Sequence, residues 1–148
     1  MTTLTPTRSS RVPTWLWAAS GLGILWNLYG VYQYVGTFTE SGKAAMTSGM
    51  TASQAAIYLS LPAWISAVFA VGVFGGTIGS VLLALRLRTA RAVFAVSLVG
   101  YAALFAGDAY YGVFAALPSQ MAILAAVVGI AATLALAARA AAKRHLLN

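Results

Sequence analysis

Four long stretches of the chain contain no Asp, Glu, Lys or Arg, and they constrain the fold more than any other feature. They cover residues 12–39, 44–85, 92–107 and 109–138. A helix needs about 20 mainly apolar residues to cross a bilayer, so the sequence has room for four spans. Charged residues make up only 7% of the 148 residues, against about 25% in a soluble domain. A soluble fold of this composition would expose large apolar patches, so lipid is the expected solvent.

The sequence therefore predicts an all-α membrane protein, a compact bundle of four transmembrane helices in one domain, residues 14–142. The expected spans cover residues 14–36, 62–85, 92–114 and 121–141. A disordered tail, residues 1–13, precedes them, and a basic tail, residues 143–148, follows. In the outer loop, residues 37–61, Thr51 and Gln54 form a capping-box pattern that predicts a short interfacial helix. Proline suits the first turn of a helix, so Pro62 and Pro118 fit the starts of the second and fourth spans.

The net charge of +7 comes from basic residues at the ends of the apolar stretches. This topology places eight on one side of the membrane and leaves only Lys43 on the other; the eight are Arg8, Arg11, Arg86, Arg88, Arg91, Arg139, Lys143 and Arg144. The positive-inside rule makes that side cytoplasmic, which predicts both termini inside and a location in the inner (cytoplasmic) membrane. Five of these residues are expected to contact lipid headgroups: Arg86, Arg88, Arg91, Lys143 and Arg144. The distribution argues against a nucleic-acid groove.

Small residues recur at helical spacing in the first and second expected spans. Gly23 and Gly30 lie on one face of the first span with Ser20 and Asn27. The stretch VGVFGGTIGS in the second span contains overlapping small-x-x-x-small patterns, made by Gly72, Gly75, Gly76, Gly79 and Ser80. Such residues let helix backbones approach closely. The pattern predicts helix packing and leaves open whether the neighbour is in this chain, in a second copy or in a partner subunit.

Asp108 interrupts the apolar stretch FAGDAYYGVF in the third expected span. An ionised carboxylate at the centre of a membrane helix costs about 2.5–3.5 kcal/mol on insertion scales, so it must face protein or water, or stay protonated. Asn27 lies at a similar expected depth, on the small-residue face of the first span. The third span has a similar face, made by Ser97, Gly100 and Gly107 with Asp108. We expect these two faces to pack closely and to pair Asn27 with Asp108. Together with Tyr110 and Tyr111 they form the candidate intramembrane polar site. The alternative is a structural carboxyl group bonded to one of these tyrosines.

Few residues of catalytic type are present. The chain has no cysteine, one histidine and only two acidic residues. His145 lies in the basic tail, far from Asp108 along the chain, and Glu40 lies in the outer loop beside Lys43. Neither a nucleophile with its base nor a metal-binding cluster can be assembled from them, so we expect no enzyme, no metal and no cofactor.

The two halves of the chain resemble each other weakly. Asn27-x-Tyr29-Gly30-Val31-Tyr32 is similar to Asp108-x-Tyr110-Tyr111-Gly112-Val113-Phe114, and Leu61-Pro62 is similar to Leu117-Pro118. One interpretation is a parallel repeat of two hairpins about an axis along the membrane normal. The other is that aromatic residues, glycine and proline are common at any outer interface.

Three stretches carry a resemblance to a known group: LWNLYGVYQY, LPAWISAVFAVGVFGGTIGSVLLALR and AVFAVSLVGY. Together they resemble a family of small, mostly uncharacterised bacterial membrane proteins with four spans, sometimes labelled sugar transporters. The resemblance covers the first three spans, and the fourth span and outer loop match only in character. It implies a four-span fold and assigns no site residues.

Two functions follow as hypotheses. In the first, the protein is an accessory, scaffold or assembly subunit that packs its glycine faces against a second copy or a larger membrane protein. In the second, it is an oligomeric small-solute transporter, for a sugar or coupled to protons, with a polar site at Asn27 and Asp108. Both predict membrane lipids as partners and no nucleic acid.

Overall fold

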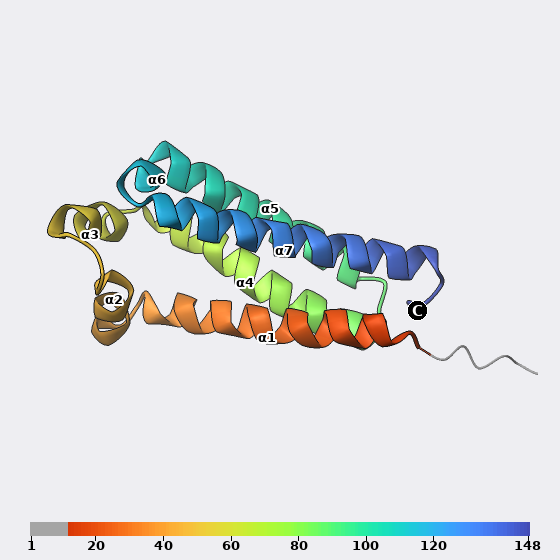
Figure 1. Cartoon of the computed structure of the whole chain (residues 1–148). Coiled ribbons are helices and arrows are strands. Elements are labelled where there is room, and N and C mark those ends of the chain that lie inside the picture. The colour runs from red at the N-terminus through yellow and green to blue at the C-terminus, as the bar shows by residue number, and fades with distance from the viewer. Residues whose placement is uncertain (1–11) are drawn as a thin grey trace, which may run out of the picture.

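The structure, a computed structural model, describes residues 12–148, and these residues form helices and connecting turns (Figure 1). Four helices are long and three are short. The long helices are α1 (Thr14–Gly36), α4 (Ala63–Ala84), α5 (Ala90–Tyr110) and α7 (Pro118–Lys143). The short helices are α2 (Glu40–Thr47), α3 (Ala52–Leu59) and α6 (Val113–Ala116).

The long helices run side by side, with α4 and α5 at the centre (Figure 1). Helix α4 packs extensively against both α1 and α5, and α5 also packs against α7, whereas α1 and α7 touch only sparsely. The short helices α2, α3 and α6 lie together at one end of the bundle, which we name the cap end. The α4–α5 loop, the start of α1 and residues 144–148 lie at the opposite end, which we name the basic end.

Three helices in the described part of the chain are long and apolar enough to cross a membrane, namely α4, α5 and α7. The protein is therefore all-helical and of membrane type. Helix α1 has 23 residues and no charged side chain, but it is not one of these three. Its tryptophans and tyrosines, with Asn27 and Gln33, lower its mean hydropathy.

The observed helix bounds refine the expected spans. Helix α1 begins and ends as predicted, at Thr14 and Gly36. The third span was expected to continue to residue 114, but α5 ends at Tyr110. Gly112 has a φ of 75°, a left-handed conformation that glycine adopts without strain and that commonly ends a helix. The chain then forms α6 and enters α7 with Pro118 in the first turn.

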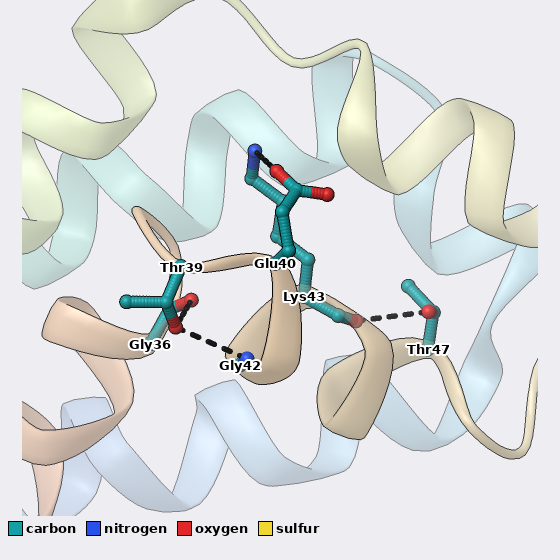
Figure 2. A network of polar contacts seen from close by, with 6 residues as sticks. All are labelled: Gly36, Thr39, Glu40, Gly42, Lys43 and Thr47. Atoms are coloured by element: carbon teal, nitrogen blue, oxygen red, sulfur yellow. Dashed lines mark hydrogen bonds and ion pairs between the residues drawn. The ribbon is translucent and has the colours of Figure 1, made fainter.

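The segment between α1 and α4 contains two short helices where the sequence predicted one (Figure 2). Thr39 caps α2, since its hydroxyl accepts a hydrogen bond from the Gly42 amide at 3.1 Å. The backbones of Gly36 and Gly42 approach so closely that a side chain on Gly42 would collide with Gly36. The predicted capping box of α3 is confirmed, because Thr51 and Gln54 exchange both of its hydrogen bonds.

Residues 144–148 do not extend from the bundle as the expected basic tail. Leu147 is 2% exposed and joins a core cluster with Leu16, Leu83 and Phe94. The backbone of Asn148 pairs with the α4–α5 loop: its amide donates to the carbonyl of Arg86 and its carbonyl accepts from the amide of Arg88. Two apolar side chains and a backbone pairing therefore hold this segment at the basic end.

Candidate functional site

Asn27 is a buried polar residue of α1, with 2% of its surface exposed. Its Nδ2 donates to the carbonyl of Gly23 at 2.8 Å. Its Oδ1 accepts from the hydroxyl of Tyr101 on α5 at 3.2 Å. Gly76 of α4 lies directly against the amide, and a Cβ added there would collide with it. Asn27 therefore links α1 to α5 across a glycine of α4.

The small residues of α4 occupy two adjacent faces. Gly76 and Ser80 face α1, where Ser80 lies against Gly23, and Val73 of the same helix lies against Gly30. The glycines of the second face meet α5, and their contacts are Gly72 with Tyr101, Gly75 with Ser97 and Gly79 with Phe94. Ser97 also donates a hydrogen bond across this interface to the carbonyl of Gly72, at 2.7 Å. The glycines that the sequence singled out thus meet neighbours within the chain.

The sequence placed the small-residue face of α1 directly against that of α5. The buried faces are as predicted: Ser20, Gly23 and Asn27 are buried on α1, and Ser97, Gly100 and Gly107 on α5. The prediction that these two faces pack against each other is wrong, because both pack on α4. Helix α4 carries small residues on two sides and can approach both neighbours closely.

The structure does not bring Asn27 and Asp108 together. Both polar atoms of Asn27 are bonded to Gly23 and Tyr101, and Tyr101 precedes Asp108 by two helical turns of α5. Asp108 is 3% exposed. Its Oδ1 atom is buried and has no hydrogen-bond partner in the described part of the chain. The expected polar site is therefore two separate sites at different depths.

Sequence reasoning missed Tyr58 of α3 as a neighbour of Asp108. Burial raises the pKa of the Tyr58 phenol and an ionised Asp108 would raise that pKa further, so the two groups lie within electrostatic range of each other. Gln54, one turn earlier, donates from Nε2 to the carbonyl of Ala116 at 2.8 Å and so attaches α3 beside α6. The i, i+4 spacing of Gln54 and Tyr58 was the available signal, because it places both on one face of the predicted helix.

The two tyrosines assigned to this site lie at its rim. Tyr110 is 83% exposed, and its ring packs edge-on against Tyr111. The hydroxyl of Tyr111 accepts a hydrogen bond from Nε1 of Trp64 at 3.3 Å, and Trp64 in turn lies against Gly107. These residues form an exposed aromatic cluster beside Asp108.

A groove opens between α1 and α7, which touch only sparsely. Its volume is about 610 Å³ and its lining carries no charged group. Small and apolar side chains from both helices line it: Ala19, Leu22, Leu25, Trp26 and Tyr29 from α1, with Gly23, and Ile130, Thr133, Leu134 and Ala137 from α7.

The residues expected to contact lipid headgroups gather at the basic end (Figure 1). Arg86 and Arg88 each donate from Nε to a backbone carbonyl of residues 146–147, at 2.8 and 3.4 Å. The guanidinium of Arg144 lies 5.9 Å from the ring centre of Trp15. Arg91 and Lys143 are exposed. Arg8 and Arg11 lie outside the described residues.

Residues 12–148 contain no group of three or more His, Cys, Asp or Glu side chains that could hold a metal ion. Comparison of the chain with protein-family models, with curated proteins and with solved structures gives no match. The functional argument therefore rests on the geometry of the bundle.

Proposed function

We propose that the protein is an accessory or assembly subunit of a membrane complex, and that it binds one transmembrane helix of a partner protein in the groove between α1 and α7. In this proposal α1 crosses the membrane with α4, α5 and α7, and the basic end faces the cytoplasm. The single observation that carries the proposal is the open, uncharged groove of about 610 Å³.

The lining of the groove suits a helix. It extends along α1 from Ala19 to Tyr29, about 15 Å at 1.5 Å per residue. Ala19, Thr133 and Ala137 contribute small side chains, which let a helix backbone approach closely. Because the lining is uncharged, the matching partner surface is an uncharged transmembrane helix.

The weak internal repeat supports the same surface. A two-fold axis relating the two hairpins would place α5 where α1 is, and α7 where α4 is. The α1–α4 contact would then correspond to the α5–α7 contact, and the tight α4–α5 contact would correspond to α7 with α1. That last pair is the one that touches only sparsely. A partner helix in the groove would supply the missing packing.

Transport by way of Asn27 is less well supported. The described bundle has no space for a water molecule in the region lined by Asn27, Gly76, Ser97 and Tyr101. A solute site there would need the bundle to open and the Asn27–Tyr101 hydrogen bond to break. The resemblance to a family sometimes labelled sugar transporters keeps transport as the alternative proposal.

The test is to fill the groove without disturbing the bundle. Thr133 is exposed and its hydroxyl bonds only to its own helix, at the Gly129 carbonyl, so Thr133→Phe should fold normally. Gly21→Phe is the matched control, since a Cβ at Gly21 meets nothing within 4 Å and Gly21 does not line the groove. Both variants and the wild type are purified in mild detergent from native membranes and analysed by native mass spectrometry.

A heterologous membrane protein that is bound by the wild type and by Gly21→Phe, but lost in Thr133→Phe, is the expected result. Crosslinks from a photoreactive group at Ala137 to a transmembrane segment of that protein would place it in the groove. A homo-oligomer that Thr133→Phe abolishes would make the occupant a second copy. A complex that survives Thr133→Phe, or a wild type that carries only lipid in the groove, would refute the proposal.

A further inference from the structure

The carboxyl group of Asp108 is buried without compensation. Only 3% of the residue is exposed, and its Oδ1 atom has no hydrogen-bond partner among the described residues. An ionised carboxylate is far more costly to bury than a neutral acid, and an unpaired group in this position takes up a proton instead. Burial therefore favours the neutral acid.

The position of Asp108 along α5 adds to this preference. Helix α5 ends at Tyr110, so Asp108 lies in its last turn. The carbonyl groups of a last turn carry a partial negative charge that disfavours an anion. The same carbonyls can accept a hydrogen bond from a protonated acid. The last turn of α5 therefore stabilises the neutral acid of Asp108, which is also the form that the unpaired Oδ1 favours.

No cation in the described residues offsets the charge that ionisation would create. Helices α4 and α6 and the cap-end half of α7 have no ionisable side chain. Tyr58 of α3 lies within electrostatic range of Asp108, and Tyr110 and Tyr111 are the titratable groups nearest to it along the chain. Lys43 of α2 is paired with Glu40 at 3.0 Å, and the arginines of α5 and α7 lie toward the basic end.

We propose that Asp108 is a proton-binding site, in which the carboxyl group is held as the neutral acid beneath α3 and exchanges its proton with the solution at the cap end. Helix α3 places Tyr58 within electrostatic range of the site and is attached beside α6 by the hydrogen bond from Gln54 to Ala116. In this proposal α3 forms the cover of the site. Access of the proton depends on movement of this short helix. The site is distant in the fold from the groove lining, so the proposal does not depend on the proposed function.

A hydrophobic carbodiimide tests the proposal, because it reacts with protonated carboxyl groups in apolar surroundings. The acid proton moves to a carbodiimide nitrogen while a carboxyl oxygen bonds to the central carbon. An acyl shift to nitrogen then gives a stable N-acylurea. No group leaves, so the labelled peptide gains the mass of the reagent. The chain suits this experiment, since its only acidic side chains are Asp108 and Glu40, and Glu40 is an exposed internal control.

The full chain in detergent micelles is treated with dicyclohexylcarbodiimide over a range of pH, and the peptides are analysed by mass spectrometry. We expect label on Asp108 and not on Glu40 at neutral pH. The labelling of Asp108 should fall about tenfold for each pH unit above its titration midpoint, as the proton leaves. Asp108→Asn, which keeps the shape of the side chain, should remove the label.

Gln54→Leu tests the role of α3, because it removes the bond that attaches this helix. Loss of one ordinary hydrogen bond should raise the labelling rate of Asp108 about fivefold, whereas Ser53→Ala, on the exposed side of α3, should leave it unchanged. Asp108 that stays unlabelled both in the wild type and in Gln54→Leu is ionised, which would overturn the proposal. Labelling that does not change with pH would overturn it too.

Discussion

The contact between Gly76 and Asn27 gives the most decisive prediction for the stability of the bundle. A methyl group added in Gly76→Ala would collide with the Asn27 amide. Asn27 is 2% exposed, and the space beside it is too small for a water molecule, so its side chain cannot move aside freely. It must leave its hydrogen bonds to Gly23 and Tyr101, or the helices must separate.

The expected loss of unfolding free energy in Gly76→Ala has two contributions. Overpacking a well-packed interior costs about 1–3 kcal/mol. Interhelical hydrogen bonds in membranes average about 0.6 kcal/mol, and the bond from Tyr101 to Asn27 is of this kind. Gly76→Ala should therefore lower the free energy of unfolding by about 2–4 kcal/mol. The helix propensity of alanine offsets little of this, because the segment stays helical in a micelle when the tertiary contacts are lost.

The assay is equilibrium unfolding of the full chain in mixed micelles with rising SDS, followed by tryptophan fluorescence. Trp26 borders the region around Asn27 and should report the change. Gly129→Ala is the matched control, since a Cβ at Gly129 meets nothing within 4 Å, and it should stay within about 0.5 kcal/mol of the wild type.

A double-mutant cycle separates the collision from a general effect of alanine. Asn27→Ala removes the side chain with which the methyl group of Gly76→Ala would collide. Gly76→Ala should therefore lower the free energy of unfolding by at least about 1 kcal/mol less in the Asn27→Ala variant than in the wild type. The reasoning would be refuted if Gly76→Ala were as mild as Gly129→Ala, or if the two substitutions near Asn27 were simply additive.

Three further predictions concern other contacts of the fold. Ser97→Ala removes the bond to Gly72 and should cost about 0.6–1.7 kcal/mol, measured in the same SDS titration, whereas Thr133→Ala removes only an exposed bond within one helix and should cost less. Leu147→Ala empties a site in the basic-end core and should cost about 2–5 kcal/mol; an unchanged midpoint would show that residues 144–148 are not held there. Thr51→Ala removes the α3 cap, worth about 0.5–2 kcal/mol, and should speed amide hydrogen exchange in α3 without changing that of α4.

The sequence predicted the buried faces of the helices well, because in an uncharged helix the spacing of small and polar residues is the main determinant of which face packs. The spacing of Ser20, Gly23 and Asn27 defines one face of α1 whatever packs on it. Which helix meets that face is not contained in the spacing, since the glycine face of α5 would accept α1 as readily as α4 does. The five small residues of α4 cover two adjacent faces, and that breadth was the available indication that it lies between two neighbours.

Two features at the helix ends had recognisable signals that the prediction of the spans did not use. Gly112 follows two tyrosines at the end of the third apolar stretch, and glycine after a helix commonly adopts the left-handed conformation that ends it. The apolar pair Leu146 and Leu147 interrupts the basic tail, and both side chains are buried. The spacing of Gln54 and Tyr58 places both on one face of α3, but it does not indicate that Tyr58 comes within range of Asp108, which depends on how α3 lies at the cap end.

The shortened α5 changes the explanation for the burial of Asp108. If the helix continued to residue 114, the carboxyl group would lie well inside the span and its burial would be explained by depth alone. With α5 ending at Tyr110, Asp108 lies close to the end of its helix, and in our proposal the cover of α3 keeps the carboxyl group buried. A cover held by short helices can open without unfolding the four long ones.

The groove, in contrast, lies between long helices and needs a partner of matching length. The two proposed sites are therefore separable by experiment: filling the groove at Thr133 should leave carbodiimide labelling of Asp108 unchanged, and Asp108→Asn should leave partner binding unchanged.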